Sequence, residues 1–396
     1  MDWDRFTFDY EIDANGMLPN VVHIEAYKEA AMNLVLPPDW RQQLDRLNRV
    51  RAVHGTTALE GNPLSEAEVA RQIDMAEMVG PRSPDGATKE QLQIRNAGLA
   101  QGWVKERFYP GCAPLTVTDL LAMHEMITQH SDTINNVPGR FRDFSVTVGS
   151  EATGGVHRGA PHENIPALMD GYIEFLRSRK LAAAHPVIRA LLAHFFLVTI
   201  HPFGDGNGRV SRLVEAGILF QGGYNVHGFY GLSNYFYRNE AEYKTSLQQS
   251  RSQQPFEVTA FVNFGLVGFA KELKGINNFI KTKLNRVVYR ATLVRAFNTH
   301  MSSRRRLLNQ REHNLLHFLL THTEPEDPFS DSPSRQITYS ELLASPYITE
   351  AYKHVTSRTF VRELFRLRDM GFIHFTTQGP ARGWTIEIDF DAIGRY

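Results

Sequence analysis

The feature that most constrains the fold of this chain is a glycine-rich segment, residues 201–212, enclosed by two apolar stretches. Residues 186–200 and 207–220 both have the apolar spacing of buried helices. The segment contains three glycines, Gly204, Gly206 and Gly208. Glycine lets the main chain approach a ligand closely, and the free N–H groups at a helix start favour an anion. The pattern therefore predicts two packed helices joined by an anion-binding loop.

The charged side chains of this segment suit a nucleotide polyphosphate. Arg209 and Arg212 are three residues apart, so they share one face of the second helix near its N-terminus, where guanidinium groups can bind phosphates. Asp205 is placed to hold Mg²⁺, which prefers carboxylate and phosphate oxygens. His201 can act as a general base near neutral pH. Together these residues predict a polyphosphate site with a base beside it.

Other interpretations of the segment explain fewer of its residues. Each residue alone is also compatible with a turn that holds a buried histidine and solvated arginines. A calcium loop would begin in a similar way at Asp205, but Arg209 stands where a third oxygen ligand is needed and Ala216 where a bidentate glutamate is needed. A Walker-type loop is excluded because the chain has no Gly-Lys-Ser/Thr sequence. The combination therefore favours the polyphosphate site.

The length and composition indicate how many domains the chain has and which classes of protein are excluded. A length of 396 residues predicts two or three domains. Lys plus Arg and Asp plus Glu each number 43, which argues against a protein that mainly coats nucleic acid or an acidic membrane. The single cysteine, Cys112, excludes an internal disulfide and fits a reducing compartment. Because the chain also has no apolar run near the ~20 residues of a membrane span and no secretory signal, we expect a cytoplasmic protein without a membrane partner.

Most of the first 280 residues have helical periodicity. Helices are expected at about 38–60, 65–78, 89–107, 165–178, 186–200 and 207–220, and a further one begins at Thr116. A loop rich in Pro and Gly is expected at 80–87. Residues 144–148 alternate like a strand and glycines follow at 149, 154 and 155, which predicts a short β-hairpin within residues 141–161.

The last hundred residues have a pattern that predicts a winged helix-turn-helix domain. In order, we expect an acidic, Pro-containing loop at 323–334, helices at 339–344 and 352–370, and strands at 372–375 and 384–388. Helix, helix and then hairpin is the order of a winged helix. The chain is therefore expected to have three parts, at about 1–110, 111–280 and 281–396.

The second of these C-terminal helices would carry a basic stripe. Arg358, Arg362 and Arg366 recur every four residues on one face. The opposite, buried face would consist of Phe360, Leu364 and Leu367. The stripe could contact phosphates in a DNA major groove, but residues 301–396 contain about twelve basic and twelve acidic groups. DNA binding and a docking or dimer-forming role therefore both remain open.

Residues 201–212 match the signature His-x-Phe-x-Asp/Glu-Gly-Asn-Gly-Arg-x-x-Arg at every defined position, and the chain therefore resembles the Fic family. The resemblance covers about residues 20–275. It includes a helix start at 185–190, a flap hairpin at 138–142 and 146–149, and a segment over the adenine at 232–235 and 243–247. It implies a mainly α fold, with a Fic-type helical core and a β-hairpin flap, followed by the C-terminal winged helix-turn-helix domain.

The resemblance implies a protein adenylyltransferase, which moves AMP from ATP to a Ser, Thr or Tyr hydroxyl of a protein, including itself. His201 would deprotonate that hydroxyl, and Asp205 would hold Mg²⁺ between the α- and β-phosphates. The implied ATP-binding residues are Gly204, Asp205, Gly206, Asn207, Gly208, Arg209, Arg212 and Tyr243. Among them, residues 206–208 would form the anion hole, and the two arginines would bind the β- and γ-phosphates. Glycine at 206, where related kinases have lysine, favours nucleotidyl transfer.

A second motif in the resemblance lies near residue 60. Thr56, Glu60 and Gly61 fit the family's inhibitory pattern Ser/Thr-x-x-x-Glu-Gly/Asn, which implies an N-terminal inhibitory helix. Glu60 would pair with Arg212 and push the γ-phosphate aside. An exposed glutamate before a helix-ending glycine is the ordinary alternative. In some relatives this glutamate also supports AMP removal by orienting water, and homodimers are usual among relatives.

The hairpin at 150–161, with His157, Arg158 and His162 nearby, would hold the target chain by backbone pairing. A solvated hairpin is the alternative. Two classes of function stay open: an adenylyltransferase inhibited by Glu60, and a DNA-binding regulator whose Fic core senses nucleotide. Transfer of another nucleotide and removal of AMP are further alternatives. An intact His201 favours the enzyme, because a sensor needs no general base.

Overall fold

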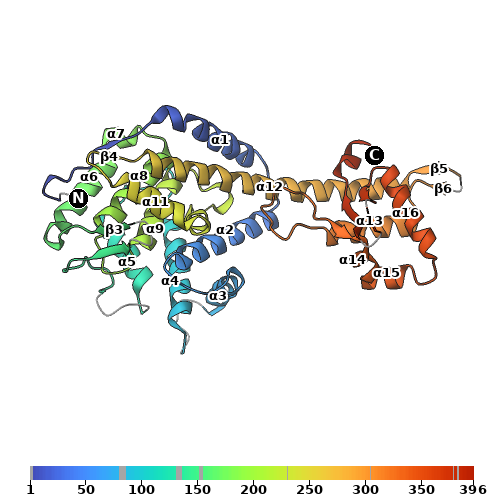
Figure 1. The fold of residues 1–396 in the computed structure, drawn as a ribbon, viewed down its shortest axis with the longest axis horizontal. Coiled ribbons are helices and arrows are strands. Elements are labelled where there is room, and N and C mark those ends of the chain that lie inside the picture. Colours follow the sequence, from blue (N-terminus) through green and yellow to red (C-terminus); the bar gives the residue numbers. More distant parts are fainter. Residues whose placement is uncertain are drawn as a thin grey trace. The chain divides into compact units, whose positions relative to one another are not determined.

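The chain forms two compact units, Met1–Leu273 and Lys274–Tyr396, and the boundary between them falls within the long helix α12 (Thr259–Asn298) (Figure 1). The computed structural model describes residues 3–79, 86–130, 136–150, 155–229, 231–303, 305–377, 379–380 and 383–396. Helices dominate both units, which confirms the predicted fold class. None of the helices in these ranges is long and apolar enough to cross a lipid bilayer.

The first unit consists of helices and two short strand pairs. Its helices before α12 are α1 (Ala14–Met32), α2 (Pro38–Ala58), α3 (Glu66–Val79), α4 (Lys89–Arg107), α5 (Val117–Thr128), α6 (Ile165–Arg177), α7 (Arg179–Ala182), α8 (Pro186–Ile200), α9 (Asn207–Gln221), α10 (Ser233–Arg238) and α11 (Glu240–Ser250). Strands β1 (Tyr10–Glu11) and β4 (Phe256–Glu257) pair in parallel, and β2 (Thr147–Ser150) pairs antiparallel with β3 (Gly155–Arg158).

The strongly periodic helices were predicted well. The ends of α4 and α8 agree with the predicted ends, and those of α2, α3, α6 and α9 differ from them by two residues or fewer. Helix α1 was not predicted as such, because Gly16 and Pro19 interrupt its helical pattern. The parallel β1–β4 pair was also missed, since each strand is only two residues long.

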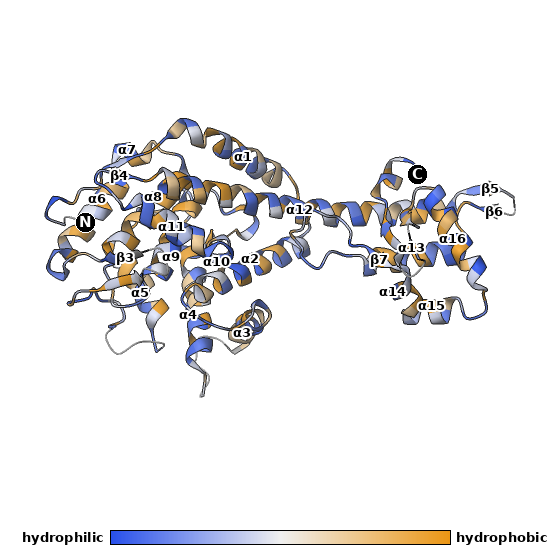
Figure 2. Cartoon of the chain, viewed as in Figure 1, coloured by the Kyte–Doolittle hydropathy of each residue, from blue (hydrophilic) through white to orange (hydrophobic). Residues whose placement is uncertain are grey.

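The core of the first unit is built around α8. Every residue from Ala190 to Ile200 is buried, as expected of a helix that is apolar on all sides, and Figure 2 shows apolar residues gathered in this part of the fold. The ring of Phe196 lies 5.2 Å from that of Phe8 and 5.7 Å from that of Phe256, so the segments that carry β1 and β4 pack on α8. Helix α9 packs against α8. The loop between these two helices is therefore held at both ends.

The β-hairpin is present, but its first strand begins later than predicted. The sequence placed a strand at 144–148, whereas β2 starts at Thr147. The carbonyl of Phe144 accepts a hydrogen bond from the Arg142 guanidinium at 2.5 Å. Phe144 therefore bonds to the Arg142 side chain and not to a neighbouring strand. Gly149 and Gly155 lie within the strands and not in the turn. The predicted turn residue Gly154 and most of the predicted loop 80–87 lie outside the described residues.

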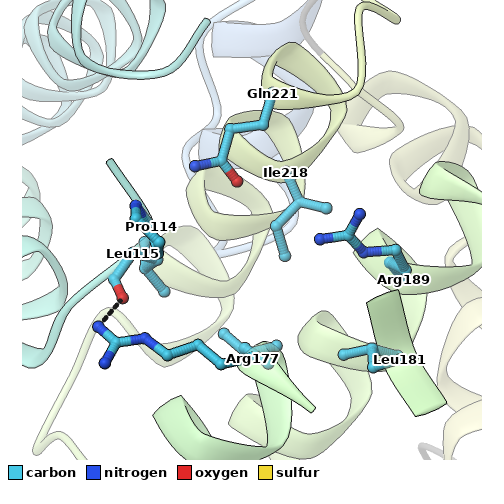
Figure 3. A pocket seen from close by; sticks show the side chains of 8 residues that line it. Pro114, Leu115, Arg177, Leu181, Arg189, Ile218 and Gln221 are labelled. Atoms are coloured by element: carbon cyan, nitrogen blue, oxygen red, sulfur yellow. Dashed lines mark hydrogen bonds between the residues drawn. The ribbon is translucent and has the colours of Figure 1, made fainter. Parts of the chain in front are cut away.

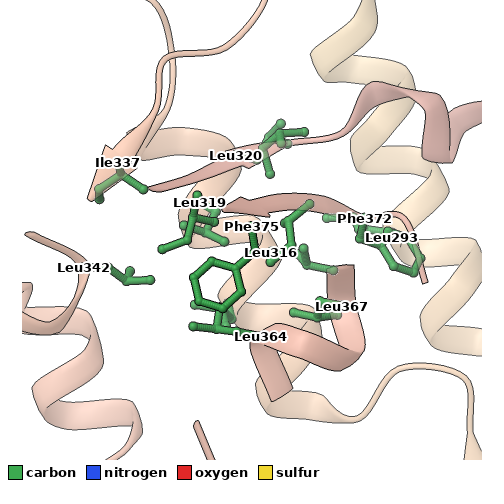
Figure 4. Packing of buried hydrophobic residues seen from close by; sticks show 14 of the residues in the cluster. Leu293, Leu316, Leu319, Leu320, Ile337, Leu342, Leu364, Leu367, Phe372 and Phe375 are labelled. Atoms are coloured by element: carbon green, nitrogen blue, oxygen red, sulfur yellow. The ribbon is translucent and has the colours of Figure 1, made fainter. Parts of the chain in front are cut away.

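The second unit begins with the end of α12 and the strand pair β5–β6, and continues with helix, strand, three helices and two strands. After α12 its elements are β5 (His300–Ser302), β6 (Arg305–Arg306), α13 (Gln310–His322), β7 (Ile337–Thr338), α14 (Tyr339–Ala344), α15 (Pro346–Ala351), α16 (Ser357–Asp369), β8 (Ile373–Thr376) and β9 (Thr385–Ile388). Strand β9 lies between β7 and β8 in one antiparallel sheet. Helices α14 to α16 thus precede the β8–β9 hairpin, in the predicted order of helices and hairpin, and the winged helix itself stays a prediction. Leu316, Leu364 and Phe372 belong to the core of this unit (Figure 4).

The predicted helix at 352–370 was wrong over its first turn. Helix α15 ends at Ala351, and residues 352–356 form a turn in which the Val355 N–H donates to the Tyr352 carbonyl at 3.0 Å. Helix α16 then begins at Ser357, because the Thr356 hydroxyl accepts from the Thr359 N–H at 3.3 Å and caps the new helix.

Candidate active site

The loop between α8 and α9 is closed by its own residues. His201 ends α8 in the left-handed region, with φ of 55°, and Gly206 precedes α9 with φ of 77°. The Asn207 side chain accepts a hydrogen bond from the Phe203 N–H at 2.9 Å and donates one to the Phe203 carbonyl at 2.8 Å. This pair of bonds fixes the loop before any ligand binds. The signature asparagine therefore acts on the loop through its side chain.

His124 of α5 supports the same loop. Its ring stacks on the buried Phe203 ring at 3.9 Å, its Nδ1 accepts from the Gly139 N–H at 3.1 Å, and its Nε2 lies 3.1 Å from the Asp205 carbonyl oxygen. Burial lowers the pKa of His124 to about 4. The neutral ring therefore carries its proton on Nε2 and donates it to the loop.

Arg142 clamps the hairpin to the loop. The side chain is buried, and its Nε donates to the His201 carbonyl at 2.8 Å while its Nη2 donates to the Ala160 carbonyl at 2.5 Å. The Arg142 N–H also donates to the Pro202 carbonyl at 3.0 Å. The base of the β2–β3 hairpin is thereby fixed beside His201.

The hairpin, the loop and three helices enclose a cavity of about 300 Å³. Its wall contains Leu59, Glu60, Val148, Gly149, His157, Val198, His201, Gly208, Arg212, Tyr243, Lys244, Leu247, Gln248 and Arg251. The cavity therefore brings together the predicted base His201, the predicted phosphate ligand Arg212 and the predicted inhibitor Glu60. Gly204, Asp205, Gly206, Asn207 and Arg209 belong to the same loop and helix start but are not part of this wall.

His201 is held as a neutral imidazole. Burial lowers its pKa, and the positive charges of Arg251 and Arg142 lower it further, to about 4. The Val198 carbonyl accepts a hydrogen bond from the ring and opposes this shift. Since one ring nitrogen donates to Val198, the other is free of its proton at neutral pH and can accept one.

Glu60 forms an ion pair with Arg212 at the edge of the cavity. Its Oε1 lies 2.7 Å from Arg212 Nη2. The guanidinium also donates through Nε to the Thr56 hydroxyl at 2.8 Å and through Nη2 to the Thr56 carbonyl at 3.1 Å. Burial alone would raise the pKa of Glu60, but Arg212 and Arg209 bring the pKa below its usual value. The carboxylate is therefore charged, and Arg212 is occupied by α2 and the turn after it.

Gly208 makes room for this ion pair. A Cβ atom at this position would lie 2.5 Å from Glu60 Oε1 and 3.0 Å from Arg212 Nη1. Gly61, with φ of 85°, lets the chain turn away immediately after Glu60. The residues of the predicted inhibitory motif thus lie together with the start of α9.

Arg209 has hydrogen-bonding capacity that the protein leaves unused. Its side chain is 2% exposed and its Nη2 lies 3.0 Å from Asp205 Oδ1. Within the described residues, Nε and Nη1 of Arg209 are buried and have no hydrogen-bond partner. A buried donor without a partner costs free energy. These donors suit a phosphate oxygen that would enter beside the helix start.

Asp205 carries the one carboxylate of the described segment 201–212. Its Oδ1 accepts from Arg209 and, at 2.6 Å, from the Gly206 N–H. The described residues contain no group of three or more His, Cys, Asp or Glu side chains that could hold a metal alone. Mg²⁺ needs no such group, because it is usually bound through one or two carboxylates together with substrate phosphates and water. The loop therefore fits Mg²⁺ through Asp205 only in company with a polyphosphate.

Tyr243 forms the opposite wall and is held by two buried side chains. Its hydroxyl lies 2.9 Å from His194 Nε2, and His194 Nδ1 lies 2.9 Å from Glu215 Oε2. The Tyr243 ring stacks on that of Phe236 at 4.7 Å. Ser233 and Asn234, from the other half of the segment expected over the adenine, pack instead on Gly55 of α2.

The hairpin contributes its inner face to the cavity. Val148 and Gly149 line it, and so does His157, whose Nε2 lies 2.8 Å from the Thr199 carbonyl oxygen. Burial, followed by the charge of Arg251, lowers the pKa of His157 to about 3. Arg158 and His162 are not part of the wall. His157 is therefore a neutral structural residue of the cavity.

Figure 3 shows a separate cavity of about 50 Å³. Its wall consists of Pro114, Leu115, Leu176, Arg177, Leu181, Arg189, Ile218 and Gln221. Arg177 donates to the Leu115 carbonyl there at 3.2 Å. None of these residues was predicted to be functional, and the space is too small for a nucleotide, since ligand pockets usually exceed about 300 Å³.

Several residues of the site were missed by sequence analysis. They are His124, Arg142, His194, Glu215 and Arg251. Arg142 lies in a segment that was singled out, but nothing there indicated its contact with His201. For the His194–Glu215 pair the sequence offered one weak indication, because each residue is a polar residue within the apolar pattern of its helix. Arg251 had no signal, because it lies four residues beyond the segment 243–247 and no motif includes it.

Residues 114–219 match the model of the Fic/DOC family, so this part of the chain is similar to that family. Over 172 residues the chain is 31% identical to the protein adenylyltransferase Fic of Drosophila ananassae, covering 43% of this chain and 32% of that protein. The corresponding protein of Aedes aegypti is 30% identical over 175 residues, or 44% of this chain and 33% of the relative. The matched region thus spans about a third of the length of these relatives.

Two solved structures share the fold. A Fic family protein from Desulfovibrio desulfuricans superposes with a TM-score of 0.56 at 20% identity, covering 97% of this chain and 98% of the other. Fic-1 of C. elegans gives a TM-score of 0.52 at 21% identity, covering 67% of this chain and 74% of the other. At these identities the comparison supports the fold and not a particular substrate.

Proposed function

We propose that this chain is a protein adenylyltransferase, which transfers AMP from ATP to a hydroxyl group of a protein, and that Glu60 inhibits it in the conformation described. The observation that carries the proposal is the position of the neutral His201 in one cavity with Arg212 and the start of α9. The name of the adenylyltransferase relatives supports the same reaction.

The proposed reaction uses His201 as a base. Its free ring nitrogen would take the proton of the target hydroxyl, and the hydroxyl oxygen would bond to the α-phosphorus while the bond to the β-phosphate oxygen breaks and pyrophosphate leaves. The N–H groups at the start of α9 have no carbonyl partner within the helix, so they can stabilise charge on the phosphate oxygens. Arg209 and Arg212 would bind the β- and γ-phosphates. Most of the catalysis would be positioning and charge stabilisation.

Mg²⁺ is part of this proposal. Asp205 would hold it together with the phosphate oxygens, and the ion would neutralise part of the phosphate charge. The Oδ1 atom of Asp205 is engaged by Arg209 and Gly206. Its side chain is nevertheless 29% exposed, so the carboxylate remains accessible.

The inhibition is proposed from the ion pair. Arg212 can meet a γ-phosphate only if Glu60 leaves it, because the carboxylate lies 2.7 Å from Nη2 and carries the same sign of charge as the phosphate. ATP would then bind with its phosphates displaced from the attacking geometry. The same glutamate could also orient water for AMP removal, which is a second reaction open to this site.

The direct test is self-labelling with ATP and Mg²⁺. Label on the α-phosphate should be incorporated by Glu60→Gly, weakly by the wild type, and not by Glu60→Gly/His201→Ala. Label on the γ-phosphate should not be incorporated, because pyrophosphate leaves. Incorporation of γ-label would indicate a kinase and contradict the proposal.

A second candidate function, DNA binding by the second unit, is favoured by its charge. Residues 274–396 contain eighteen Lys and Arg but only twelve Asp and Glu, because α12 adds basic residues that the range 301–396 omits. A groove of about 700 Å³ is lined by four arginines, Arg306, Arg311, Arg362 and Arg366, and by two glutamates, Glu312 and Glu363. A different groove is lined by Glu326, Asp327 and Glu387 together with Arg335. Basic residues therefore outnumber acidic ones in the first groove, and acidic residues outnumber basic ones in the second.

The predicted arginine stripe is only partly available for DNA. Arg366 is half-buried and bonds to Glu312, so it supports the fold. Arg358 and Arg362 are exposed, and no ion pair is formed by either within the described residues. The buried face of Phe360, Leu364 and Leu367 is as predicted. The stripe is thus reduced to two arginines on α16.

DNA binding is tested by the salt dependence of binding to a labelled duplex. Each phosphate contact adds about 0.9 to the slope of log K against log salt. Arg358→Ala/Arg362→Ala should therefore lower the slope by about 2. The control Arg335→Ala/Lys353→Ala removes the same charge from residues paired with Glu326 and Glu350 and should change it little. No binding at low salt, or equal losses in both variants, would exclude a DNA site on α16.

A further inference from the structure

Arg251 is a cation in the cavity that the family signature does not include. It follows α11 and lines the same space as His201 and Tyr243. Its Nε donates to the Thr199 hydroxyl at 3.0 Å, and that hydroxyl donates to the Phe195 carbonyl at 2.6 Å. The guanidinium is therefore anchored to α8 through one nitrogen.

The other cations of the cavity wall are paired with carboxylates. Arg212 is 2.7 Å from Glu60, and Lys244 is 2.5 Å from Glu240. Within the described residues no carboxylate lies within ion-pair distance of Arg251. Burial lowers the pKa of Arg251 to about 10, so the group stays charged at neutral pH. A partly dehydrated cation without a counterion is unfavourable, which points to a ligand that supplies the negative charge.

The position of Arg251 relative to His201 identifies the phosphate that it can reach. Arg251 and His201 line the same cavity, and Arg251 is bonded to Thr199, which lies only two residues before His201 at the end of α8. If His201 is the base of the transfer reaction, the phosphorus under attack lies next to it. The oxygens nearest to Arg251 are then those of the α-phosphate.

We propose that Arg251 is an anion subsite for the α-phosphate of the nucleotide, and that it works while Glu60 still holds Arg212. The inference rests on the proposed nucleotide function of the cavity and extends it to a residue outside the signature. It has a specific consequence: AMP, whose only phosphate is the α-phosphate, should bind to the inhibited wild-type protein. The Glu60–Arg212 pair engages the proposed γ-phosphate ligand, Arg212, and does not include Arg251.

Calorimetric titration of the full chain with AMP and with adenosine tests this subsite. Arg251→Gln should weaken AMP binding about 10-fold or more, the usual range for a lost charge-assisted hydrogen bond. Adenosine has no phosphate, so its affinity should stay the same. Arg251→Lys keeps the charge and should restore part of the AMP affinity, which also guards against a folding defect in the glutamine variant.

The matched control is Arg46→Gln. It removes one positive charge from an arginine that is paired with Asp74 and does not line the cavity, and it should change the AMP affinity by about twofold or less. Equal weakening of AMP and adenosine by Arg251→Gln would show that Arg251 only supports the wall. Unchanged AMP binding would place the phosphate elsewhere, including the case where Arg251 contacts a target carboxylate. If the wild type binds neither AMP nor ATP, the nucleotide function itself is refuted.

Discussion

Glu60 Oε1 and Arg212 Nη2 are 2.7 Å apart although the two residues are separated by 152 positions in the chain. The contact joins the turn after α2 to the start of α9. The Glu60 side chain is 30% exposed, whereas that of Arg212 is 3% exposed. Of the two partners, Glu60 is therefore the one that can leave without disturbing the core. Release of inhibition is expected to begin with a movement of this turn.

Gly208→Ala tests whether the start of α9 and Glu60 compete for space. The new Cβ would lie 2.5 Å from Glu60 Oε1, so the carboxylate must move and its bond to Arg212 weakens. In the Glu60→Gly background the clash with the carboxylate disappears, and only the contact with the flexible Arg212 guanidinium, 3.0 Å from the new Cβ, remains. A double-mutant cycle measured by urea unfolding should give a coupling free energy of about 1 kcal/mol. Additive effects would show that the two residues do not interact.

The pH dependence of transfer should report His201. The His201 ring must be neutral to accept a proton, so the transfer rate should fall at acid pH as this ring becomes protonated. Burial and the charges of Arg251 and Arg142 lower the pKa of His201 to about 4. In Glu60→Gly the rate should therefore be independent of this group above about pH 6. Removing the positive charge in Glu60→Gly/Arg251→Gln raises the pKa of His201, and the acid limb should move to higher pH. A single-turnover pH profile of both proteins measures the shift; an unchanged acid limb would contradict the assigned role of Arg251 in keeping the ring neutral.

Asn207→Ala should damage the loop more than a surface change would. The side chain makes two hydrogen bonds to the main chain of Phe203 and is 3% exposed. Losing both leaves buried groups without partners, at a cost of about 1–3 kcal/mol. Thermal unfolding should show a lower melting temperature, and AMP transfer by the Glu60→Gly/Asn207→Ala protein should fall. Asn239→Ala, at a partly buried asparagine that donates to the Tyr235 carbonyl at 2.9 Å, is a comparison outside the loop.

Tyr243→Phe should separate the hydrogen bond of this residue from its ring. The ring would still stack on Phe236, but the buried His194 Nε2 would lose its partner. We expect a stability loss of about 1 kcal/mol and only a small change in the KM for ATP, since the ring forms the wall. Tyr243→Ala removes the wall and should raise the KM strongly. A large KM change in the phenylalanine variant would indicate that the hydroxyl itself contacts the nucleotide.

The sequence predicted helices and loops best where the residues that determine them lie within one short segment. The helices on both sides of residues 201–212 and the α2 helix before Glu60 were predicted from spacing and from turn residues. These features are local, so periodicity and glycine positions report them. The pairing of Glu60 with Arg212 was expected from the family resemblance, and the structure has the two side chains in contact.

The supporting contacts could not be predicted because they join distant parts of the chain. Arg142 meets His201 across 59 positions, and Arg251 meets Thr199 across 52. The residues next to Arg142 and Arg251 in the sequence do not distinguish these arginines from arginines that are exposed to solvent. Only the folded core shows that one of them is a buried clamp and that the other lacks a carboxylate partner within the described residues. The start of α16 was missed for a related reason, since Thr356 acts as a cap inside an otherwise helical pattern.

If His201 performs AMP transfer once Glu60 releases Arg212, self-labelling should depend on both residues. The measurement uses ATP that carries its label on the α-phosphate, with the wild type, Glu60→Gly and Glu60→Gly/His201→Ala. We expect strong labelling of Glu60→Gly, weak labelling of the wild type and none of the double variant. Equal labelling of the wild type and Glu60→Gly would contradict inhibition by Glu60. Labelling that persists in the double variant would contradict the role of His201.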